Sequence, residues 1–153
     1  MSMTVGDFLV ERLYEWGVRR IYGYPGDGIN GVFGALNRAK GKIQFIQARH
    51  EEMAAFMACA HAKFTGELGV CIATSGPGAS HLITGLYDAR MDHMPVLAIS
   101  GQQARNALGG HYQQELDLVT ERFGRGSAPP GSGADVPPDE VSGPAAVAGS
   151  QTG

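Results

Sequence analysis

The chain has few cysteines, no excess of positive charge and no long apolar run, and each of these shortages excludes a class of protein. Of its 153 residues only two are cysteines, Cys59 and Cys71, and both stand in apolar runs. Buried reduced thiols are therefore expected, rather than a disulfide framework or metal ligands. The formal net charge is −3, which provides no basic face for a nucleic-acid backbone. No window approaches the ~18 uncharged apolar residues that a membrane span requires.

The amino end also lacks the pattern of a secretory signal. Residues 1–7 contain no basic region followed by an apolar core. Together with the reduced thiols, this predicts a cytoplasmic protein with no membrane span and no nucleic-acid partner. The length suffices for one domain with a sizeable core.

Helix-like and strand-like segments alternate over the first 100 residues. Apolar residues at helical spacing alternate with short, continuous apolar runs, and turns rich in glycine separate them. This alternation predicts an α/β fold with a doubly wound, mostly parallel sheet and helices on both faces. Strands are expected at 21–24, 43–48, 68–73 and 95–100, and helices at 5–16, 29–36, 51–64 and 81–92.

The composition changes near the carboxyl end. A short helix is expected at 113–123, after which residues 125–153 are rich in Gly, Pro and Ser and have only three large apolar residues, all valines. Such a stretch cannot bury enough surface to offset its chain entropy, so a domain at 1–124 and a disordered tail at 125–153 are predicted. The abrupt change suggests a truncated domain with a frameshifted or artificial end, which resequencing of the coding DNA would test.

An acidic residue, Glu51, stands where the strand at 43–48 passes into the helix at 51–64. Ligands of open parallel sheets bind at the carboxyl ends of the strands, which makes Glu51 a candidate site residue. The next strand ends in Thr74-Ser75-Gly76-Pro77-Gly78, whose small residues and free amides let a planar or anionic ligand approach the main chain. Alone this turn is equally consistent with a tight connection, but with Glu51 one strand earlier the combination is more specific.

A rival interpretation comes from Gly26-Asp27-Gly28-Ile29-Asn30-Gly31. It matches G-x-G-x-x-G between a strand and a helix, with Glu51 about 20 residues further on, as in an NAD(P)-binding Rossmann fingerprint. Against it, Pro25 stiffens the turn, a full helix precedes the first strand, and the turn at 74–78 goes unexplained. An NAD(P)-binding oxidoreductase fragment and a non-catalytic interaction module remain alternatives.

Four motifs lie in order along the chain. They are Tyr24-Pro25-Gly26, Arg49-His50-Glu51-Glu52, Thr74-Ser75-Gly76-Pro77-Gly78 and Asp92-His93-Met94-Pro95-Val96-Leu97. Together they resemble the pyrimidine-binding domain of thiamine diphosphate-dependent enzymes, over roughly residues 3–119. Within that family the chain is most similar to pyruvate oxidase, quinone-linked pyruvate dehydrogenase and acetolactate synthase.

The resemblance implies a catalytic role for Glu51. In the family a glutamate at this position hydrogen-bonds N1′ of the aminopyrimidine and favours its imino tautomer, so that the 4′-nitrogen can remove the proton from thiazolium C2. The neighbouring Glu52 better suits the other role of an acidic residue at this place, which is to face the helix dipole.

The resemblance also implies the residues around the cofactor. Pro25 and Gly26 would wall the pyrimidine, Thr74 and Gly78 would line its pocket, and His81 would lie near it. Gln114 matches a glutamine at the substrate entrance of acetolactate synthase, although the phenylalanine expected before it is Gln113 here.

The family's diphosphate and Mg²⁺ are held by another domain, usually from another subunit, so no metal site is expected in this chain. The resemblance therefore implies a parent homo-oligomer, a dimer or tetramer, that decarboxylates a pyruvate-like 2-keto acid and in some members uses FAD. The chain alone is expected to bind thiamine diphosphate poorly and to be inactive.

Overall fold

The computed structural model describes residues 2–108 and 110–116. The expected tail at 125–153, and with it the predicted boundary at 124, lies outside the described residues. So does most of the helix expected at 113–123. Its described part, residues 113–116, is not helical: residues 113 and 114 form a turn, and Gln114 has a positive φ of 60°.

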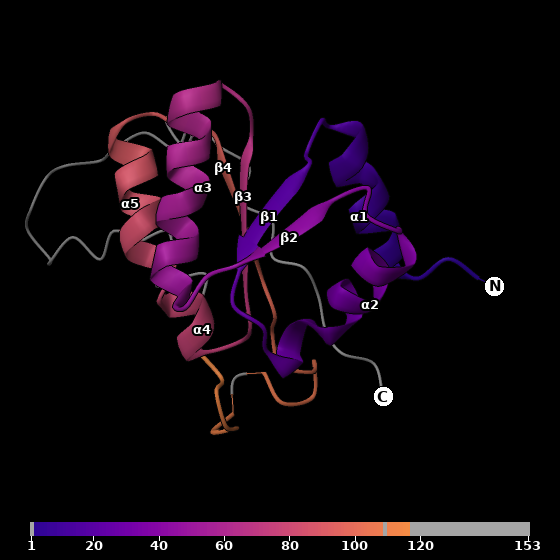
Figure 1. Cartoon of the computed structure of the whole chain (residues 1–153). Helices are drawn as coiled ribbons and strands as arrows, with labels where there is room; N and C mark the ends of the chain where they lie inside the picture. Colours follow the sequence, from indigo (N-terminus) through magenta and orange to yellow (C-terminus); the bar gives the residue numbers. More distant parts are fainter. Residues whose placement is uncertain (1, 109, 117–153) are drawn as a thin grey trace, which may run out of the picture.

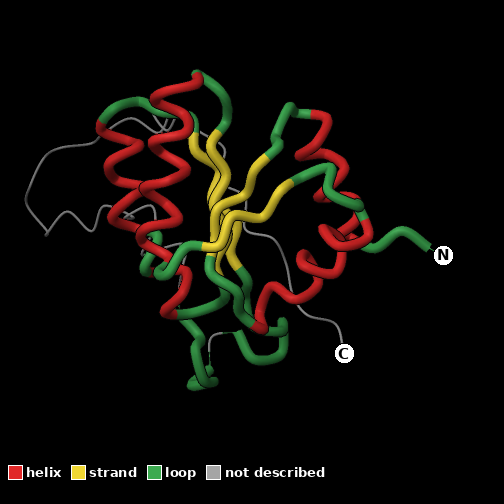
Figure 2. The backbone as a smooth tube through the Cα atoms, in the orientation of Figure 1, coloured by secondary structure: helices red, strands yellow, loops and turns green. Residues whose placement is uncertain are grey.

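Four parallel strands form the sheet of the described chain (Figures 1 and 2). They are β1 (Arg20–Gly23), β2 (Gln44–Gln47), β3 (Gly69–Ala73) and β4 (Val96–Ser100), in the order β2-β1-β3-β4. The chain moves from β1 outward to β2 and then crosses back over β1 to β3, so the winding direction reverses between β1 and β3. In doubly wound sheets, ligands bind outside the strand ends at this switch point.

Helices cover both faces of the sheet, which confirms the predicted fold class (Figure 1). One face carries α1 (Val5–Glu15) and α2 (Asn30–Arg38), and the other carries α3 (Glu51–Thr65) and α5 (Ile83–Met91). Two shorter helices, η1 (Asp27–Ile29) and α4 (Pro77–Ser80), follow β1 and β3. The predicted strands and first three helices are found within a few residues of their expected bounds.

The helix expected at 81–92 is found as α5, which begins two residues later than expected, and a separate short helix, α4, precedes it in the turn after β3. α4 begins at Pro77, and α5 begins at Ile83 after a break at His81 and Leu82. Proline is favoured at the first position of a helix, where its missing N–H has no partner to lose. The α4 helix therefore begins inside the turn at 74–78, which the sequence analysis placed before the helix.

A capping box starts α1 and ties it to α2. The Thr4 hydroxyl accepts the Asp7 N–H at 3.1 Å, and the Asp7 carboxylate accepts the Thr4 N–H at 2.9 Å. The Arg38 guanidinium of α2 donates to the same carboxylate at 2.8 Å. These hydrogen bonds, that of Arg38 first, lower the pKa of Asp7 to about 2.

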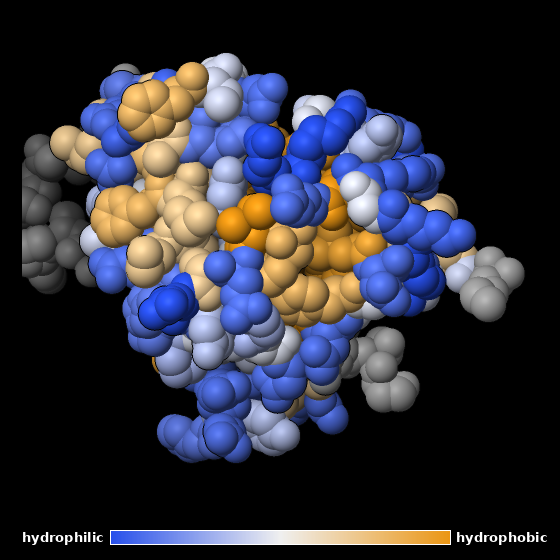
Figure 3. Space-filling model, viewed as in Figure 1, coloured by the Kyte–Doolittle hydropathy of each residue, from blue (hydrophilic) through white to orange (hydrophobic). Residues whose placement is uncertain are grey.

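The α3 helix is apolar on two sides, only one of which is buried. Its alanines, including Ala54, Ala55 and Ala58, are fully buried against the sheet and α5. Met53, Phe56 and Phe64 face outward and are 53%, 40% and 90% exposed. Figure 3 shows apolar surface over this helix that continues toward the edge strand β2. The α3 helix therefore carries an outer apolar face with no partner among the described residues.

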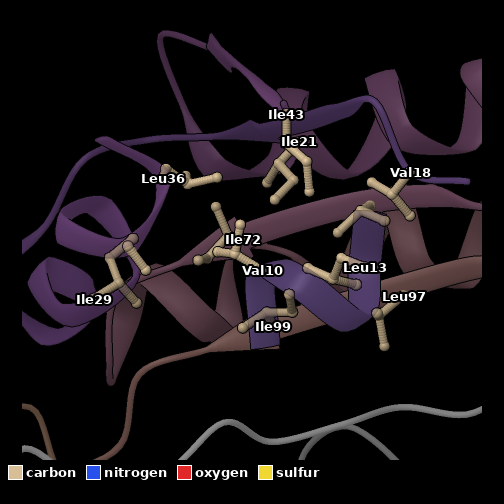
Figure 4. Packing of buried hydrophobic residues seen from close by; sticks show 12 residues of the cluster. Val10, Leu13, Val18, Ile21, Ile29, Leu36, Ile43, Ile72, Leu97 and Ile99 are labelled. Atoms are coloured by element: carbon tan, nitrogen blue, oxygen red, sulfur yellow. The ribbon is translucent and has the colours of Figure 1, made fainter. Parts of the chain in front are cut away.

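The larger core cluster lies between the sheet and the α1–α2 layer (Figure 4). Its isoleucines Ile21, Ile72 and Ile99 come from three strands and are at most 1% exposed. β3 is buried along its whole length, as expected for a parallel strand covered on both faces. This packing makes the central strands a rigid support for the turns that follow them.

Both cysteines are buried thiols outside any disulfide, as the sequence predicts. The Cys59 thiol donates to the Asp88 carboxylate at 3.1 Å. Burial, followed by the hydrogen bond and the charge of Asp88, raises the pKa of Cys59 to about 11. The thiol therefore stays protonated and unreactive at neutral pH.

Candidate functional site

The Glu51 carboxylate lies at the carboxyl-end edge of the sheet. β2 ends at Gln47, and Glu51 is the first residue of α3, where the helix dipole favours a negative charge. Its side chain is only 12% exposed. The Glu51 carboxylate is thus mostly buried and lies at the edge of the sheet that its strand-to-helix junction predicts.

Two imidazole rings flank one oxygen of this carboxylate. His81, in the break between α4 and α5, donates from Nδ1 to Glu51 Oε2 at 3.0 Å. His50 is the N-cap of α3, where its Nδ1 accepts the Glu52 N–H at 3.3 Å and its Nε2 lies 3.9 Å from the same Oε2. The two ring centroids are 4.6 Å apart. His81 therefore bonds to Oε2, and His50 lies near the same oxygen rather than near Oε1.

Thr74 joins the turn after β3 to the turn after β1. A Cβ added at Gly26 would collide with Thr74 Cβ, and one added at Gly28 would lie 2.7 Å from Thr74 Oγ1. The Gly28 N–H donates to the same hydroxyl at 3.1 Å. Glycine is needed at both positions because the Thr74 side chain fills the space that a side chain would take. The two turns thus meet across the switch point.

Gly78 brings the turn after β3 up to Glu51. A Cβ there would lie 2.7 Å from Thr74 Cγ2 and 3.4 Å from Glu51 Oε1. The absence of this side chain keeps the space in front of Oε1 open. Within residues 2–108 and 110–116, Oε1 accepts no hydrogen bond. The structure thus brings together Gly26, Thr74, Gly78, Glu51 and His81, all of which the sequence nominates.

The loop after β4 closes one side of this group. Gln114 lies against Gly76, where an added Cβ would collide with the Gln114 carbonyl oxygen. Gln103 donates to the Ser75 hydroxyl at 3.3 Å and to the Gln113 carbonyl at 3.1 Å. The predicted entrance residue Gln114 therefore sits beside the turn at 74–78.

Residues 3–120 match the family described as thiamine pyrophosphate enzyme, N-terminal TPP binding domain. The chain belongs to this family. Thiamine pyrophosphate is another name for thiamine diphosphate, so the resemblance drawn from the four motifs is confirmed.

Relatives of the chain carry names consistent with this family. A Bacillus subtilis protein described as thiamine pyrophosphate-containing, YdaP, is 50% identical over 115 residues, which are 75% of this chain and 20% of that protein. The pyruvate oxidase of Lactiplantibacillus plantarum is 44% identical over 76% of this chain and 19% of its own length. The acetolactate synthase isozyme 2 large subunit of Escherichia coli is 44% identical over 76% of this chain and 21% of its own. The chain thus spans about a fifth of the length of these relatives.

The residues of this thiamine diphosphate enzyme domain fit the aminopyrimidine part of the cofactor. A flat heterocycle needs a wall without side chains and a carboxylate edge, and Gly78 and Glu51 provide both. In the described part of the chain, one cluster of potential metal ligands is found, and it contains two imidazoles rather than the oxygen ligands that Mg²⁺ prefers. The fit therefore concerns the pyrimidine and not the diphosphate.

The Rossmann alternative receives no support. Its fingerprint glycines Gly26 and Gly28 face Thr74, so their free sides are filled by the protein itself. A pyrophosphate would need those sides for its close approach to the backbone. The family match and the glycine contacts thus both disfavour a dinucleotide site.

Sequence reasoning missed two parts of the site. His50, for which the sequence predicts no definite role, caps α3. The local signal for this cap is its position directly before a helix that has acidic residues in its first turn. His81 was expected near the cofactor, yet its direct partner is the Glu51 carboxylate. That contact joins residues 30 positions apart in the sequence, and no spacing rule predicts it.

No helix among the described residues combines the length and apolarity that crossing a bilayer would take.

Proposed function

We propose that this chain supplies the aminopyrimidine half of a thiamine diphosphate site, with Glu51 as the partner of N1′. The observation that carries the proposal is the Glu51 carboxylate itself. It is largely buried, its Oε2 is engaged by His81, and its Oε1 faces the side-chain-free surface of Gly78. A planar ring resting on that surface would present its edge nitrogen to Oε1.

Each residue then has a distinct task. Glu51 Oε1 shares a proton with N1′, and His81 holds Oε2 so that the carboxyl group keeps one orientation. Pro25 and Gly26 wall the ring, while Thr74 and Gly78 set its depth, and Gln114 borders the substrate entrance. When bound, thiamine diphosphate supplies a nucleophilic carbon at C2 of its thiazolium ring. The chain's contribution is to position and polarise the ring that removes the C2 proton.

The whole protein is proposed to act on a pyruvate-like 2-keto acid, because relatives are named pyruvate oxidase and acetolactate synthase. Mg²⁺, the diphosphate and possible FAD would be held outside this segment. A homo-oligomer, dimer or tetramer, is proposed because Met53, Phe56 and Phe64 form an exposed apolar face on α3. The reduced, buried thiols of Cys59 and Cys71 support a cytoplasmic location.

A chimera tests the role of Glu51. Residues 3–120 replace the matching segment of the Lactiplantibacillus plantarum pyruvate oxidase, and hydrogen–deuterium exchange at cofactor C2 is followed by NMR after acid quench. Because N1′ loses its proton partner, Glu51→Gln is expected to slow exchange by roughly 10²–10⁴-fold.

Glu52→Gln is the matched control, since Glu52 lies next to Glu51 in the first turn of α3 but has no proposed contact with the cofactor. Exchange in this variant should match that of the parent chimera. An unchanged exchange rate in Glu51→Gln would refute the assignment of Glu51.

A further inference from the structure

The cluster of His50, Glu51 and His81 has a second property beyond the proposed cofactor role. It offers two imidazole nitrogens and one carboxylate oxygen whose ligand atoms all lie within 4.8 Å of one another. We propose that these three residues form a binding site for a transition-metal dication such as Zn²⁺. The expectation of a chain without a metal site would then be incomplete.

The distances suit such an ion after small movements. Ligands of a tetrahedral zinc at 2.0–2.1 Å lie roughly 3.3 Å from one another. His81 Nδ1 is 3.0 Å from Glu51 Oε2, and His50 Nε2 is 3.9 Å from the same atom. Two pairs therefore depart from the tetrahedral spacing by less than 1 Å, and a water would complete the shell.

The surroundings give the ion an entry path and fixed ligands. The side chains of His50 and His81 are 48% and 44% exposed, while Glu51 lies beneath them at 12%. The two rings are tilted by 30° with their centroids 4.6 Å apart, so both already lie beside the carboxylate. A site with two histidines and one carboxylate selects Zn²⁺, Ni²⁺, Co²⁺ or Cu²⁺ over Mg²⁺.

Metal binding exchanges two local contacts. Coordination through His81 Nδ1 moves the hydrogen of that ring to Nε2, so the hydrogen bond from Nδ1 to Glu51 Oε2 is replaced by the metal between the two atoms. The His50 ring now accepts the Glu52 N–H at Nδ1, which in the neutral ring leaves its hydrogen on Nε2. Coordination through Nε2 moves that hydrogen to Nδ1 and gives up the cap bond, which is long at 3.3 Å. The metal replaces a weak cap bond with a coordination bond, so α3 keeps its anchored first turn.

Isothermal titration of the full 153-residue chain with ZnCl₂ tests the site. One ion per chain is expected, with no heat of binding for MgCl₂. His81→Gln and Glu51→Gln should each weaken zinc binding by roughly 10–100-fold or more. His50→Asn should do the same while keeping a side chain that can cap the helix.

His93→Asn is the control, because His93 lies outside the cluster and has a positive φ of 53° that asparagine tolerates. Its zinc affinity should equal that of the wild type. Absence of zinc binding in the wild type, or an equal loss in His93→Asn, would overturn the proposal.

A second measurement needs no variant. Diethylpyrocarbonate labelling of the wild-type chain, read by mass spectrometry, should show that Zn²⁺ protects His50 and His81 but not His93 or His111. Uniform protection, or none, would contradict the site even if a substituted chain failed to fold.

One consequence rests on the proposed function. If Glu51 also binds N1′, zinc and thiamine diphosphate exclude each other, and zinc should raise the apparent dissociation constant of the cofactor in the chimera. Failure of this competition alone, with zinc binding intact, would count against the cofactor role of Glu51 and leave the metal site standing.

Discussion

Gly78→Ala tests the packing between the turn at 74–78 and Glu51. The added Cβ would lie 2.7 Å from Thr74 Cγ2, whereas carbon atoms pack best at about 3.5–4.0 Å. Thr74 cannot turn away easily, because Gly26 and Gly28 pack against its other atoms. Overpacking of this kind costs about 1–3 kcal/mol of the free energy of unfolding.

Thr74→Ser should rescue that loss. It removes Cγ2 and keeps the hydroxyl that accepts the Gly28 N–H, at a cost of about 1 kcal/mol for the lost methyl group. In the double variant the nearest atoms known to remain around the new Cβ are Glu51 Oε1 at 3.4 Å and the Cβ of residue 74 at 3.7 Å. The two changes should therefore couple favourably by about 1–2 kcal/mol.

Urea unfolding of the 153-residue chain measures all four states of this cycle. Gly31→Ala is the control for helix propensity, because Gly31 lies in α2 with nothing within 4 Å of an added Cβ. It should stabilise the chain by about 0.5–1 kcal/mol. Additivity of Gly78→Ala and Thr74→Ser within about 0.5 kcal/mol would refute the packing argument.

The same pair separates stability from function. In the chimera the double variant should be about as stable as Thr74→Ser alone, yet bind thiamine diphosphate more weakly, because the methyl group still stands in front of Glu51 Oε1. Recovery of both stability and affinity would contradict the proposed place of the pyrimidine ring.

Three further outcomes follow from contacts away from the site. The Asp7 carboxylate has a lowered pKa, from 3.8 to about 2, so its stabilising effect is present above about pH 4 and is lost as the pH falls toward 2. The difference in urea midpoint between wild type and Asp7→Asn should therefore shrink between pH 4 and pH 2. A difference that stays constant over this range would contradict the role of the Asp7 charge. Because burial raises the pKa of Cys59 to about 11, labelling by a thiol reagent at pH 8, followed by mass spectrometry, should be far slower in the native chain than in urea. Gly85→Ala should destabilise the chain by about 1–3 kcal/mol in urea unfolding, since its Cβ would lie 2.6 Å from that of Ala55, and a gain in stability would show that α3 and α5 are less closely packed.

The order of strands and helices follows from local patterns. Continuous apolar runs predict the buried strands, and Thr4, a favoured N-cap residue, predicts the start of α1. The position of Glu51 is also predictable, because every strand-to-helix junction of a parallel sheet lies at the same edge, the carboxyl ends of the strands.

Other features depend on contacts between distant segments. The helix break at His81 and Leu82 leaves no mark in apolar spacing, yet it is what turns the His81 ring toward Glu51. The packing of Thr74 against Gly26 likewise joins two turns that are adjacent only once β1 and β3 pair. Such contacts require the assembled sheet, so sequence spacing nominates the residues without their geometry.

The central claim is that Glu51 contacts N1′ of thiamine diphosphate. A crystal structure of the chimera with bound cofactor measures it directly. The account predicts a Glu51 carboxylate oxygen about 2.6–3.2 Å from N1′, with the pyrimidine resting on Gly78. An N1′ atom whose hydrogen-bond partner is another residue, with Glu51 turned away from the ring, would contradict it.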